Sequence, residues 1–192
     1  MEKRNTKTDF LIAFWTLYEK KQIETISIRE LCQLAGYNRT TFYVYYENIY
    51  DLLDQAIDDM LTPLKETLQH VNELNTFFGS QSMEALLLKI FPSTDKYIEL
   101  LFKRQHYLLL SDKIKKELLF LLKQSLNKTE EDMQALQLIL EYQVSAAFGA
   151  MKYWIETGKI ISEETFIKTI YHISTIGALP LLSKEIECLQ EG

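Results

Sequence analysis

The sequence has 192 residues, of which 47% are hydrophobic and 25% are charged, and its formal net charge is -6 at pH 7. This length and hydrophobic content predict a soluble globular protein with an ample core in one or two domains. No apolar run approaches the ~20 residues that a membrane span requires, and the polar N-terminus is not a signal peptide, so we expect a cytoplasmic protein without membrane contact.

The first predicted helix spans Thr8 to Lys20. Its apolar residues recur at helical spacing along one stripe, which is formed by Phe10, Ala13, Phe14, Leu17 and Tyr18. Over the whole chain glycine and proline are few, whereas Leu, Ile, Lys, Glu and Gln are abundant. Because this composition favours helices and no strand pattern occurs, we predict an all-α fold.

The twenty residues that begin at Ser27 predict two short helices joined by a tight turn. Ser27 and Glu30 have the spacing of a capping box, in which the serine oxygen accepts from a first-turn amide and the glutamate reaches back to the serine amide. Gly36 ends the helix Ile28–Ala35, because glycine enters the left-handed conformation without steric cost. Asn38 then caps the second helix. This arrangement is typical of a helix-turn-helix.

The second helix of this pair, which begins at Arg39, has two distinct faces. Phe42 and Tyr46 lie four residues apart on one face, which we expect to be buried. The side chains that point elsewhere are those of Arg39, Thr40, Tyr43 and Val44. One face therefore anchors the helix, and the other is free to contact a partner.

In this stretch the sequence resembles the DNA-binding segment of the tetracycline-repressor (TetR) family of bacterial transcription regulators. The matching residues are Ala13, Leu17, Ser27, Arg29, Leu31, Ala35, Gly36, Thr41, Phe42, Tyr43, Tyr45, Tyr46 and Leu52. They occupy several spaced positions in roughly the first quarter of the chain. The resemblance implies a three-helix DNA-binding domain with a helix-turn-helix in residues 1–48, followed by a larger helical ligand-binding and dimerisation domain in residues 49–192.

The resemblance also implies how DNA would be bound. A recognition helix enters the major groove, and a homodimer presents two such helices about 34 Å apart to a near-palindromic operator in double-stranded DNA. Arg39 and Thr40 would then face base edges, and Arg29 would reach base or backbone. The remaining residues of the predicted DNA-binding set are Asn38, Thr41, Tyr43, Tyr45 and Asn48, most of which would hold phosphates. Each side chain alone is more often a surface or packing residue, so only their joint occurrence predicts DNA binding.

Three features depart from the family pattern or from a simple DNA binder. Gln22 stands where family members usually have a glycine, which predicts a different turn or some backbone strain. Ile49 stands where many members have a phosphate-gripping lysine, so we expect weaker or differently placed anchoring, through the helix N-terminus and Asn48. Residues 1–50 contain seven Lys or Arg and six Asp or Glu, a net charge of +1, which leaves -7 for the remainder. The sign fits DNA contact at the N-terminal end, but this charge alone would not predict it.

The rest of the chain is predicted as further helices. A long helix begins after Asn48 and is kinked or split at Pro63. A loop at residues 72–79, helices at residues 81–91, 94–109, 111–126, 129–157 and 162–176, and a short helix after Pro180 follow in that order. The predicted break before the helix 111–126 rests on Ser111 as its cap.

The predicted helix 129–157 is apolar on two sides. One face carries Met133, Leu136, Leu140, Val144, Ala147 and Met151, and the other carries Ile139, Tyr142, Ala146, Gly149 and Tyr153. Small residues on this helix would let a second helix approach closely. Together with the helix 162–176 the pattern predicts half of an intermolecular four-helix bundle, which is the homodimer interface typical of the resembled family. The alternative is that both faces are covered within one subunit.

By the same resemblance, a small-molecule effector binds among the C-terminal helices, shifts the connecting helix and releases a repressor from DNA. Candidates for the effector pocket are amphipathic or aromatic residues in apolar helices, namely Tyr97, Phe102, His106, Tyr107, Tyr142 and Trp154. Ordinary core packing is the alternative for each of them.

Other functional classes have less support in the sequence. We predict no catalytic residue, no metal site and no cofactor, because His70, His106 and His172 lack metal-ligand spacing and no phosphate-binding loop or nucleophile motif occurs. Cys32 and Cys188 are isolated at apolar helical positions, which favours core thiols. The alternative to a repressor is a TetR-like helical adaptor or co-activator that acts through a protein partner.

Overall fold

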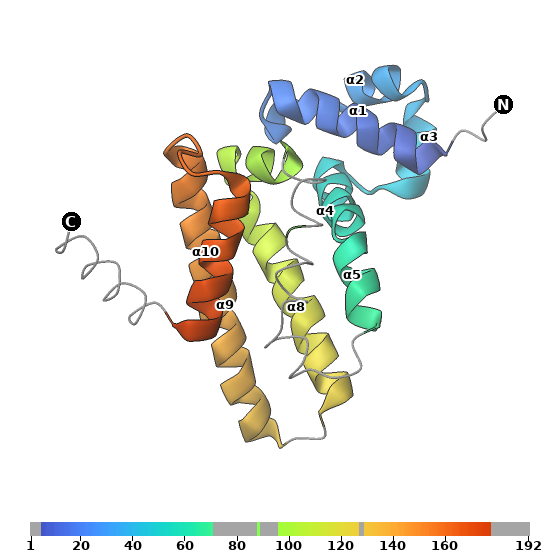
Figure 1. The fold of residues 1–192 in the computed structure, drawn as a ribbon. Coiled ribbons are helices and arrows are strands. Elements are labelled where there is room, and N and C mark those ends of the chain that lie inside the picture. Colours follow the sequence, from blue (N-terminus) through green and yellow to red (C-terminus); the bar gives the residue numbers. More distant parts are fainter. Residues whose placement is uncertain (1–4, 71–87, 89–95, 127–128, 178–192) are drawn as a thin grey trace. The chain divides into compact units, whose positions relative to one another are not determined.

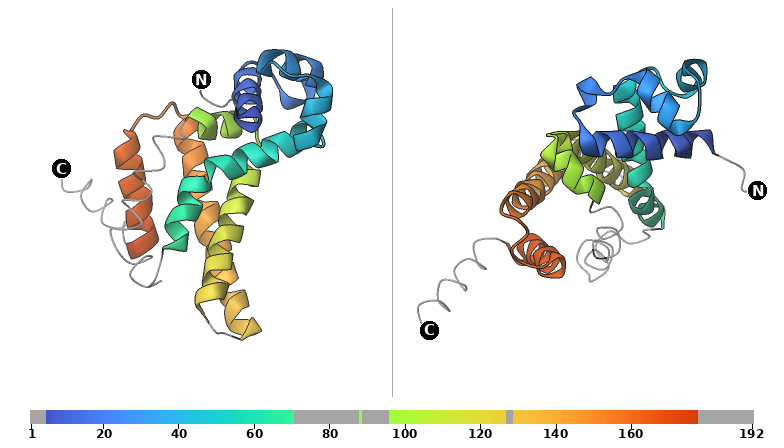
Figure 2. Two further views of the ribbon diagram at one scale, coloured as in Figure 1. Left: turned by 90° about the vertical axis from the view of Figure 1, so that its right-hand side faces the viewer. Right: turned by 90° about the horizontal axis from the view of Figure 1, so that it is seen from above.

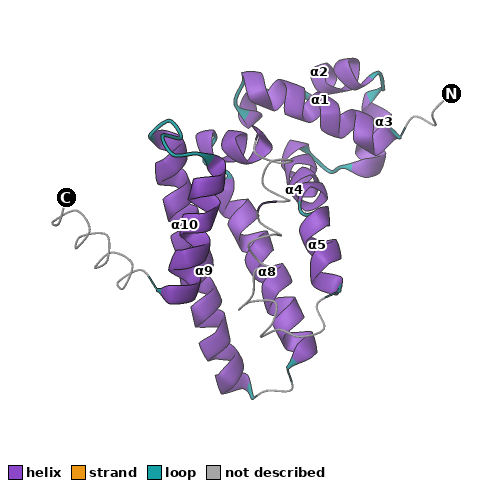
Figure 3. Cartoon of the chain, in the orientation of Figure 1, coloured by secondary structure: helices purple, strands orange, loops and turns teal. Residues whose placement is uncertain are grey.

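The computed structural model describes residues 5–70, 88, 96–126 and 129–177 (Figure 1). Throughout these ranges the chain forms helices and loops and contains no strand (Figure 3), so the predicted all-α class is confirmed. The predicted loop at residues 72–79, the helix at residues 81–91 apart from one residue, the segment after Pro180 and Cys188 lie outside the described residues.

The named helices follow the prediction closely in the N-terminal part of the chain and in its last third. They are α1 (Thr6–Lys20), the 3-10 helix η1 (Ile23–Thr25), α2 (Ile28–Ala35), α3 (Arg39–Tyr45), α4 (Ile49–Met60), α5 (Thr62–Gln69), α8 (Tyr107–Ser125), α9 (Glu130–Glu156) and α10 (Glu163–Ile176). Residues 96–103 are also helical.

Two compact units contain the described residues. The first takes in the described parts of Met1–Thr62 and Lys96–Leu110, and the second those of Pro63–Asp95 and Ser111–Gly192. The predicted boundary after residue 48, which separates a DNA-binding domain from a regulatory domain, stays a prediction.

An aromatic cluster forms the core of the first unit. Phe10 of α1 is fully buried, and its ring centroid lies 5.3 Å from that of Tyr37, 5.6 Å from that of Phe42 and 5.9 Å from that of Tyr46. The last two contacts are edge-to-face, the arrangement that aromatic quadrupoles favour. Phe42 and Tyr46 are buried, as predicted, so this cluster attaches α3 to α1.

Gln22 lies in a turn that requires no glycine. Lys21 and Gln22 have extended backbones, with φ of -151° and -67°, and the 3-10 helix η1 follows directly. Because both φ values are negative, the turn carries none of the strain that a left-handed residue would bring. The first of the two predicted outcomes, a different turn, is therefore the observed one.

The segment 96–110 lies against α1 within the first unit. The Tyr97 ring is 4.5 Å from the Trp15 ring, and the Tyr18 hydroxyl is 2.7 Å from Nδ1 of His106. Lys96 forms an ion pair with Glu19 at 3.0 Å. Aromatic packing, a hydrogen bond and an ion pair thus hold this segment on α1.

The predicted helix boundary at Ser111 is wrong. The helical run that includes residues 96–103 stops before Gln105, which has a φ of +61°, and α8 begins at Tyr107. The amide of His106 donates to the Leu101 carbonyl at 2.8 Å, which completes a Schellman-type stop with Gln105 in the left-handed position. Ser111 lies inside α8 with 2% of its surface exposed, so it caps nothing.

The long helix predicted after Asn48 is split, as expected. Helix α4 ends at Met60, and α5 begins at Thr62 with Pro63 as its second residue. Proline has no amide to donate and is tolerated in the first turn of a helix, so it begins a new helix here.

The second unit contains the antiparallel pair α9 and α10, which lie side by side in both figures (Figures 1 and 2). Thr129 and Ser162 cap these helices, as predicted, and accept from the amides of Asp132 and Thr165. The Trp154 ring stacks on Phe166 with 4.5 Å between centroids, and its Nε1 donates to the Ile161 carbonyl at 2.9 Å.

Candidate nucleic-acid interface

The turn between α2 and α3 is built from local sequence signals. The Ser27 side chain accepts from the Glu30 amide, which caps α2 as predicted. Gly36 has a φ of +81°, and the Tyr37 amide donates to the Cys32 carbonyl at 2.9 Å. Only glycine adopts this left-handed conformation without cost, so Gly36 fixes the end of α2.

The Glu30 carboxylate does not complete the predicted capping box. It accepts instead from the Lys21 ammonium at 2.5 Å, and this ion pair joins α2 to the end of α1. An oppositely charged partner from another element is a stronger attraction for a carboxylate than a neutral amide. The reciprocal half of the predicted box is therefore replaced by a tertiary contact.

Asn38 caps the recognition helix α3. Its Oδ1 accepts from the Thr41 amide at 2.8 Å and from the Thr41 hydroxyl at 3.0 Å. This uses the side chains of both residues for local structure, although both belong to the predicted DNA-binding set. Asn38 is exposed and Thr41 is half-buried.

The outer face of α3 is formed by four exposed side chains, Arg39, Thr40, Tyr43 and Val44, which we call the exposed α3 face. The exposed fraction is 59% for Tyr43 and 72% for Val44. The opposite face holds Phe42, which is fully buried. The helix is thus anchored on one side and open on the other, as the four-residue spacing predicts.

The other predicted DNA-binding residues surround this face. Arg29 on α2 is exposed, and Tyr45 at the end of α3 is half-buried. Asn48 is exposed, and its Oδ1 accepts from the amides of Tyr50 and Asp51, which caps α4. The structure therefore gathers the predicted set onto α2, α3 and the start of α4 within one compact unit (Figure 1).

The side chain of Ile49 has no group that can bind a phosphate. Its side chain is 9% exposed and belongs to the core of the first unit. The first turn of α4 instead offers the exposed side chains of Asn48 and Tyr50. The Glu47 amide donates to Oδ2 of Asp51 at 2.8 Å, so a carboxylate already occupies that donor.

Burial controls the titration of the core phenols and of the thiol in this unit. Burial, with smaller contributions from Asp51 and Asp59, raises the pKa of Tyr46 to about 12. Burial also raises the pKa of Tyr18 far above its ordinary value, and Arg104 opposes that shift. Burial raises the pKa of the Cys32 thiol, which is 3% exposed, so this residue fits the predicted core thiol.

Sequence reasoning missed one polar residue of the interface region. Tyr37 lies in the turn between α2 and α3, and its hydroxyl donates to Oδ2 of Asp9 at 2.8 Å. The two residues are far apart in sequence and carry no spacing signal, so only the fold brings them together.

The predicted effector residues are divided between the two compact units. Tyr97, Phe102, His106 and Tyr107 belong to the first unit, and Tyr142 and Trp154 belong to the second. Phe102 is buried and stacks on Tyr107 with 4.7 Å between ring centroids. Trp154 is buried against Phe166, whereas Tyr142 is 70% exposed.

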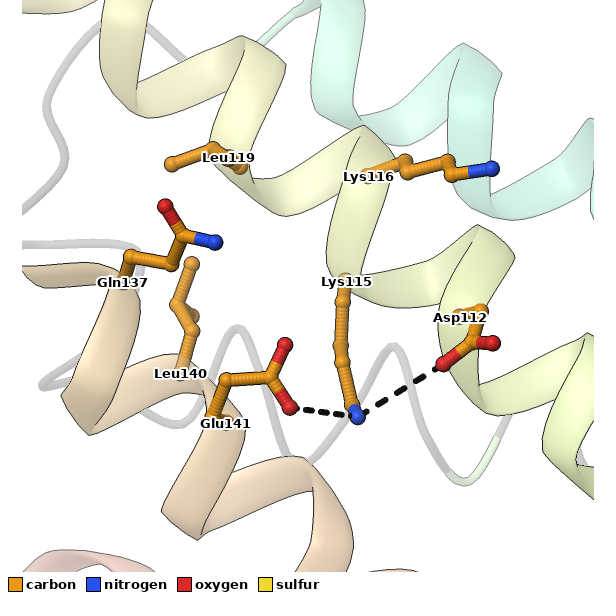
Figure 4. A pocket seen from close by; sticks show the side chains of 7 residues that line it. All are labelled: Asp112, Lys115, Lys116, Leu119, Gln137, Leu140 and Glu141. Atoms are coloured by element: carbon orange, nitrogen blue, oxygen red, sulfur yellow. Dashed lines mark hydrogen bonds and ion pairs between the residues drawn. The ribbon is translucent and has the colours of Figure 1, made fainter. Parts of the chain in front are cut away.

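None of these six residues lines the hollow that the described residues form between α8 and α9. An open hollow of about 210 Å³ lies between α8 and α9 (Figure 4), with walls formed by Asp112, Lys115, Lys116, Leu119, Gln137, Leu140 and Glu141. Lys115 spans it and forms ion pairs with Glu141 at 2.6 Å and with Asp112 at 3.7 Å. The ammonium at its centre is therefore already neutralised by two carboxylates.

The described ranges contain neither a cluster of metal-binding side chains nor a helix that could span a membrane. No group of three or more His, Cys, Asp or Glu side chains suited to a metal ion occurs among residues 5–70, 88, 96–126 and 129–177. Over the same part of the chain, every helix is too short or too polar to cross a bilayer.

Comparison with known proteins gives a fold match without a sequence match. No protein-family model matches the chain, and no curated protein matches its sequence. Among solved structures, the chain is similar to the dihydroxyacetone kinase operon activator DhaS, with 19% sequence identity and a TM-score of 0.55. The match covers 88% of this chain and 93% of that chain, so the similarity includes both compact units. At this identity the match shows a shared helical fold, and membership of the TetR family stays a prediction.

Proposed function

We propose that this chain is a cytoplasmic, non-enzymatic transcription regulator of the TetR type that binds a near-palindromic site in double-stranded DNA as a homodimer. The observation that carries the proposal is the exposed α3 face. Its polar, cationic and apolar side chains are exposed, although the Tyr43 ring also packs edge-to-face on Phe42, and Phe42 anchors the helix. A helix presented in this way fits the major groove of B-form DNA.

Chemical groups on this surface suit distinct parts of DNA. The Arg39 guanidinium has the fork geometry that pairs with O6 and N7 of guanine, and Thr40 accepts or donates one hydrogen bond to a base edge. Tyr43, Tyr45 and the exposed Arg29 suit phosphate contacts, which set register. At the start of α4, the backbone amides of Asn48 and Ile49 take the place of the family lysine, because the Tyr50 and Asp51 amides already donate to Oδ1 of Asn48.

The homodimer is proposed from the outer side of α9. Ile139, Tyr142 and Tyr153 are each more than half exposed, and Ala146 and Gly149 between them are exposed as well. On the opposite face of α9, Val144 is buried, and Met133, Leu136, Leu140, Ala147 and Met151 are half-buried. These exposures favour the intermolecular interpretation over the alternative in which one subunit covers both faces.

For regulation we propose a repressor that a small-molecule effector releases. This part rests on the resemblance of the N-terminal segment, and of the predicted pocket residues we retain those of the first unit, namely Tyr97, Phe102, His106 and Tyr107. His106 is the member best placed to affect the DNA-binding unit, because it bonds to Tyr18 of α1. A ligand that competes for His106 would disturb α1 directly.

A second candidate function is a helical adaptor or co-activator that works through a protein partner. Two observations favour it. The structural neighbour is described as an operon activator, and the phosphate-gripping position holds the buried Ile49. In this alternative the chain increases transcription and needs a partner for its effect.

Selection of double-stranded DNA from a random pool tests the first proposal. We expect a near-palindromic site whose dissociation constant rises steeply with salt. Arg39→Ala should weaken binding by about 1 to 3 kcal/mol and relax the preference at one position in each half-site. Lys123→Ala, which removes one exposed positive charge on α8, is the matched control and should leave affinity unchanged.

The same selection separates the two candidate functions. Enrichment of a site by the chain alone supports the direct DNA binder. If the chain alone enriches no sequence at any salt concentration, direct DNA binding is wrong. A complex that then forms only with a DNA-bound protein would support the adaptor.

A further inference from the structure

Tyr37 connects the turn of the helix-turn-helix to α1. Its hydroxyl donates to Oδ2 of Asp9 at 2.8 Å, and its ring lies 5.3 Å from that of Phe10, the next residue on α1. Both Tyr37 and Asp9 are half-buried. A hydrogen bond to an ionised carboxylate in such a site is stronger than one between neutral groups.

Because of the position of Tyr37 in the chain, this contact affects the orientation of α3. Gly36 before it ends α2 in the left-handed conformation, and Asn38 after it caps α3 through the Thr41 amide. Tyr37 is therefore the one residue between the stop of the first helix and the cap of the second. A displacement of Tyr37 passes directly to the first turn of α3, where Arg39 and Thr40 are located.

The aromatic cluster fixes how deeply α3 is buried, but it does not fix the rotation of α3 to the same degree. Phe42 and Tyr46 contact Phe10 edge-to-face, and such ring contacts stay favourable over centroid separations of about 4.5 to 7 Å, so they restrain the helix only loosely. A hydrogen bond weakens steeply when its angle departs from linearity. The bond from Tyr37 to Asp9 thus supplies the directional restraint at the N-terminal end of α3.

We propose that the Tyr37–Asp9 hydrogen bond positions the recognition helix and so contributes to discrimination between the operator and other DNA. The inference rests on the proposed DNA-binding function. Neither residue is expected to contact a base. Their role is to hold Arg39 and Thr40 at the angle from which base edges are reached, because bidentate base contacts require precise geometry.

Specific and non-specific binding respond differently to such a restraint. Non-specific binding depends on charge near the phosphates, which Tyr37→Phe leaves unchanged. Specific binding depends on the orientation of a few side chains. Loss of the restraint should therefore lower the ratio of operator affinity to random-DNA affinity, without changing the salt dependence of random-DNA binding.

The test measures this ratio for the full chain and its variants, using the site selected by the unaltered chain and random DNA of equal length. Tyr37→Phe keeps the ring and removes the hydroxyl, and Asp9→Ala removes the acceptor. Each should lower the ratio about fivefold, and the double variant should lower it no further. Asp9→Asn retains an acceptor oxygen and should restore most of the ratio.

Thr16→Val is the matched control, because it also removes a hydroxyl that is bonded on α1, in this case to the Ile12 carbonyl of the same helix. Its ratio should stay within about twofold of that of the unaltered chain. An unchanged ratio in Tyr37→Phe, or an equal fall in Thr16→Val at a matched loss of unfolding free energy, overturns the positioning role alone. Failure of the unaltered chain to select any site overturns the proposed function as well.

Discussion

Val44 is the residue of the exposed α3 face whose chemistry is least expected in water. It is 72% exposed, and its branched side chain lowers helix propensity without any packing contribution in return. Thr40 lies four residues earlier on the same face and adds its own methyl group to the two of Val44. In a protein that binds DNA, apolar groups at such positions contact the 5-methyl group of thymine.

Replacement of thymine by uracil tests this contact without altering the protein. At the contacted position of each half-site, uracil should weaken the unaltered chain about fourfold, because burial of one methyl group stabilises a complex by about 0.8 kcal/mol. Val44→Ala should weaken binding to the thymine-containing site by a similar factor, and the affinity of this variant should not change when thymine is replaced by uracil. Gel-shift titrations of both proteins on both DNA molecules give four dissociation constants, which show whether the effects of the two changes depend on each other. An equal effect of uracil on the two proteins would assign the methyl contact to another residue.

Tyr46 makes the first unit sensitive to alkaline pH. Its pKa of about 12 in the folded chain is above the ordinary value of 10.0, so folding binds the phenol proton more tightly. The stability from this shift is fully present below pH 10 and is lost as the pH rises towards 12. Between pH 10 and pH 12, the free energy of unfolding of the unaltered chain should therefore fall by about 1 to 2 kcal/mol more than that of Tyr46→Phe. Denaturant unfolding at each pH measures this, with the exposed Tyr43→Phe as control; equal losses in both variants would contradict it.

At the scale of helices, the sequence predicts those boundaries that depend on neighbouring residues. Ser27, Asn38, Thr129 and Ser162 cap the helices that follow them, as their spacing indicates. The same local signal failed at Ser111, which is buried inside α8. A serine caps a helix only where the backbone is non-helical. In this segment the backbone leaves the helix at Gln105, and glutamine is a residue type without a turn preference.

The candidate interface was predictable to a similar extent and for the same reason. The two faces of α3 follow from a four-residue period, so burial of Phe42 and exposure of Tyr43 were both foreseen. Contacts between elements were not foreseen, because no spacing rule connects Lys21 with Glu30 or Asp9 with Tyr37. The division of the predicted effector residues between two units likewise depends on the path of the chain in space.

Two helices end at a residue in the left-handed conformation, Gln105 and Gly158, and substitutions at these two positions should change stability in opposite directions. Gln105 has a φ of +61° and Gly158 a φ of +83°, in the same type of helix stop. Gln105→Gly should raise the free energy of unfolding by about 0.5 to 1 kcal/mol, because glycine has no Cβ to clash. Gly158→Ala should lower it by about 1 kcal/mol, although no atom of the described chain lies within 4 Å of the new Cβ. Chemical denaturation of the two variants checks both signs, and a loss of stability in Gln105→Gly would show that its side chain holds the stop.

At the scale of the whole molecule, the uneven distribution of charge along the chain bears on how the proposed dimer would bind DNA. Residues 1–50 carry a net charge of +1 and the remainder carries -7, so the part that carries the exposed α3 face is the less repelled by phosphate. A dimer doubles the number of recognition helices and thereby raises affinity without a basic body. Dimerisation is therefore a requirement of the proposed function, and the outer face of α9 is where it can be tested.

Gly149 offers the sharpest test of that interface. It lies within α9, and a Cβ built on it meets no atom of the described chain within 4 Å. Gly149→Leu should therefore leave the single chain folded and even favour the helix, since glycine is the poorer helix former by about 0.8 to 1 kcal/mol. If a partner helix approaches closely at this point, the added side chain overpacks the interface twice by symmetry and should raise the dimer dissociation constant about a hundredfold. Sedimentation equilibrium measures the constant, and Lys123→Leu on α8 controls for the addition of an exposed apolar side chain. A dimer of unchanged affinity in Gly149→Leu would place the interface elsewhere, and a monomeric unaltered chain would exclude the two-headed mode of DNA binding.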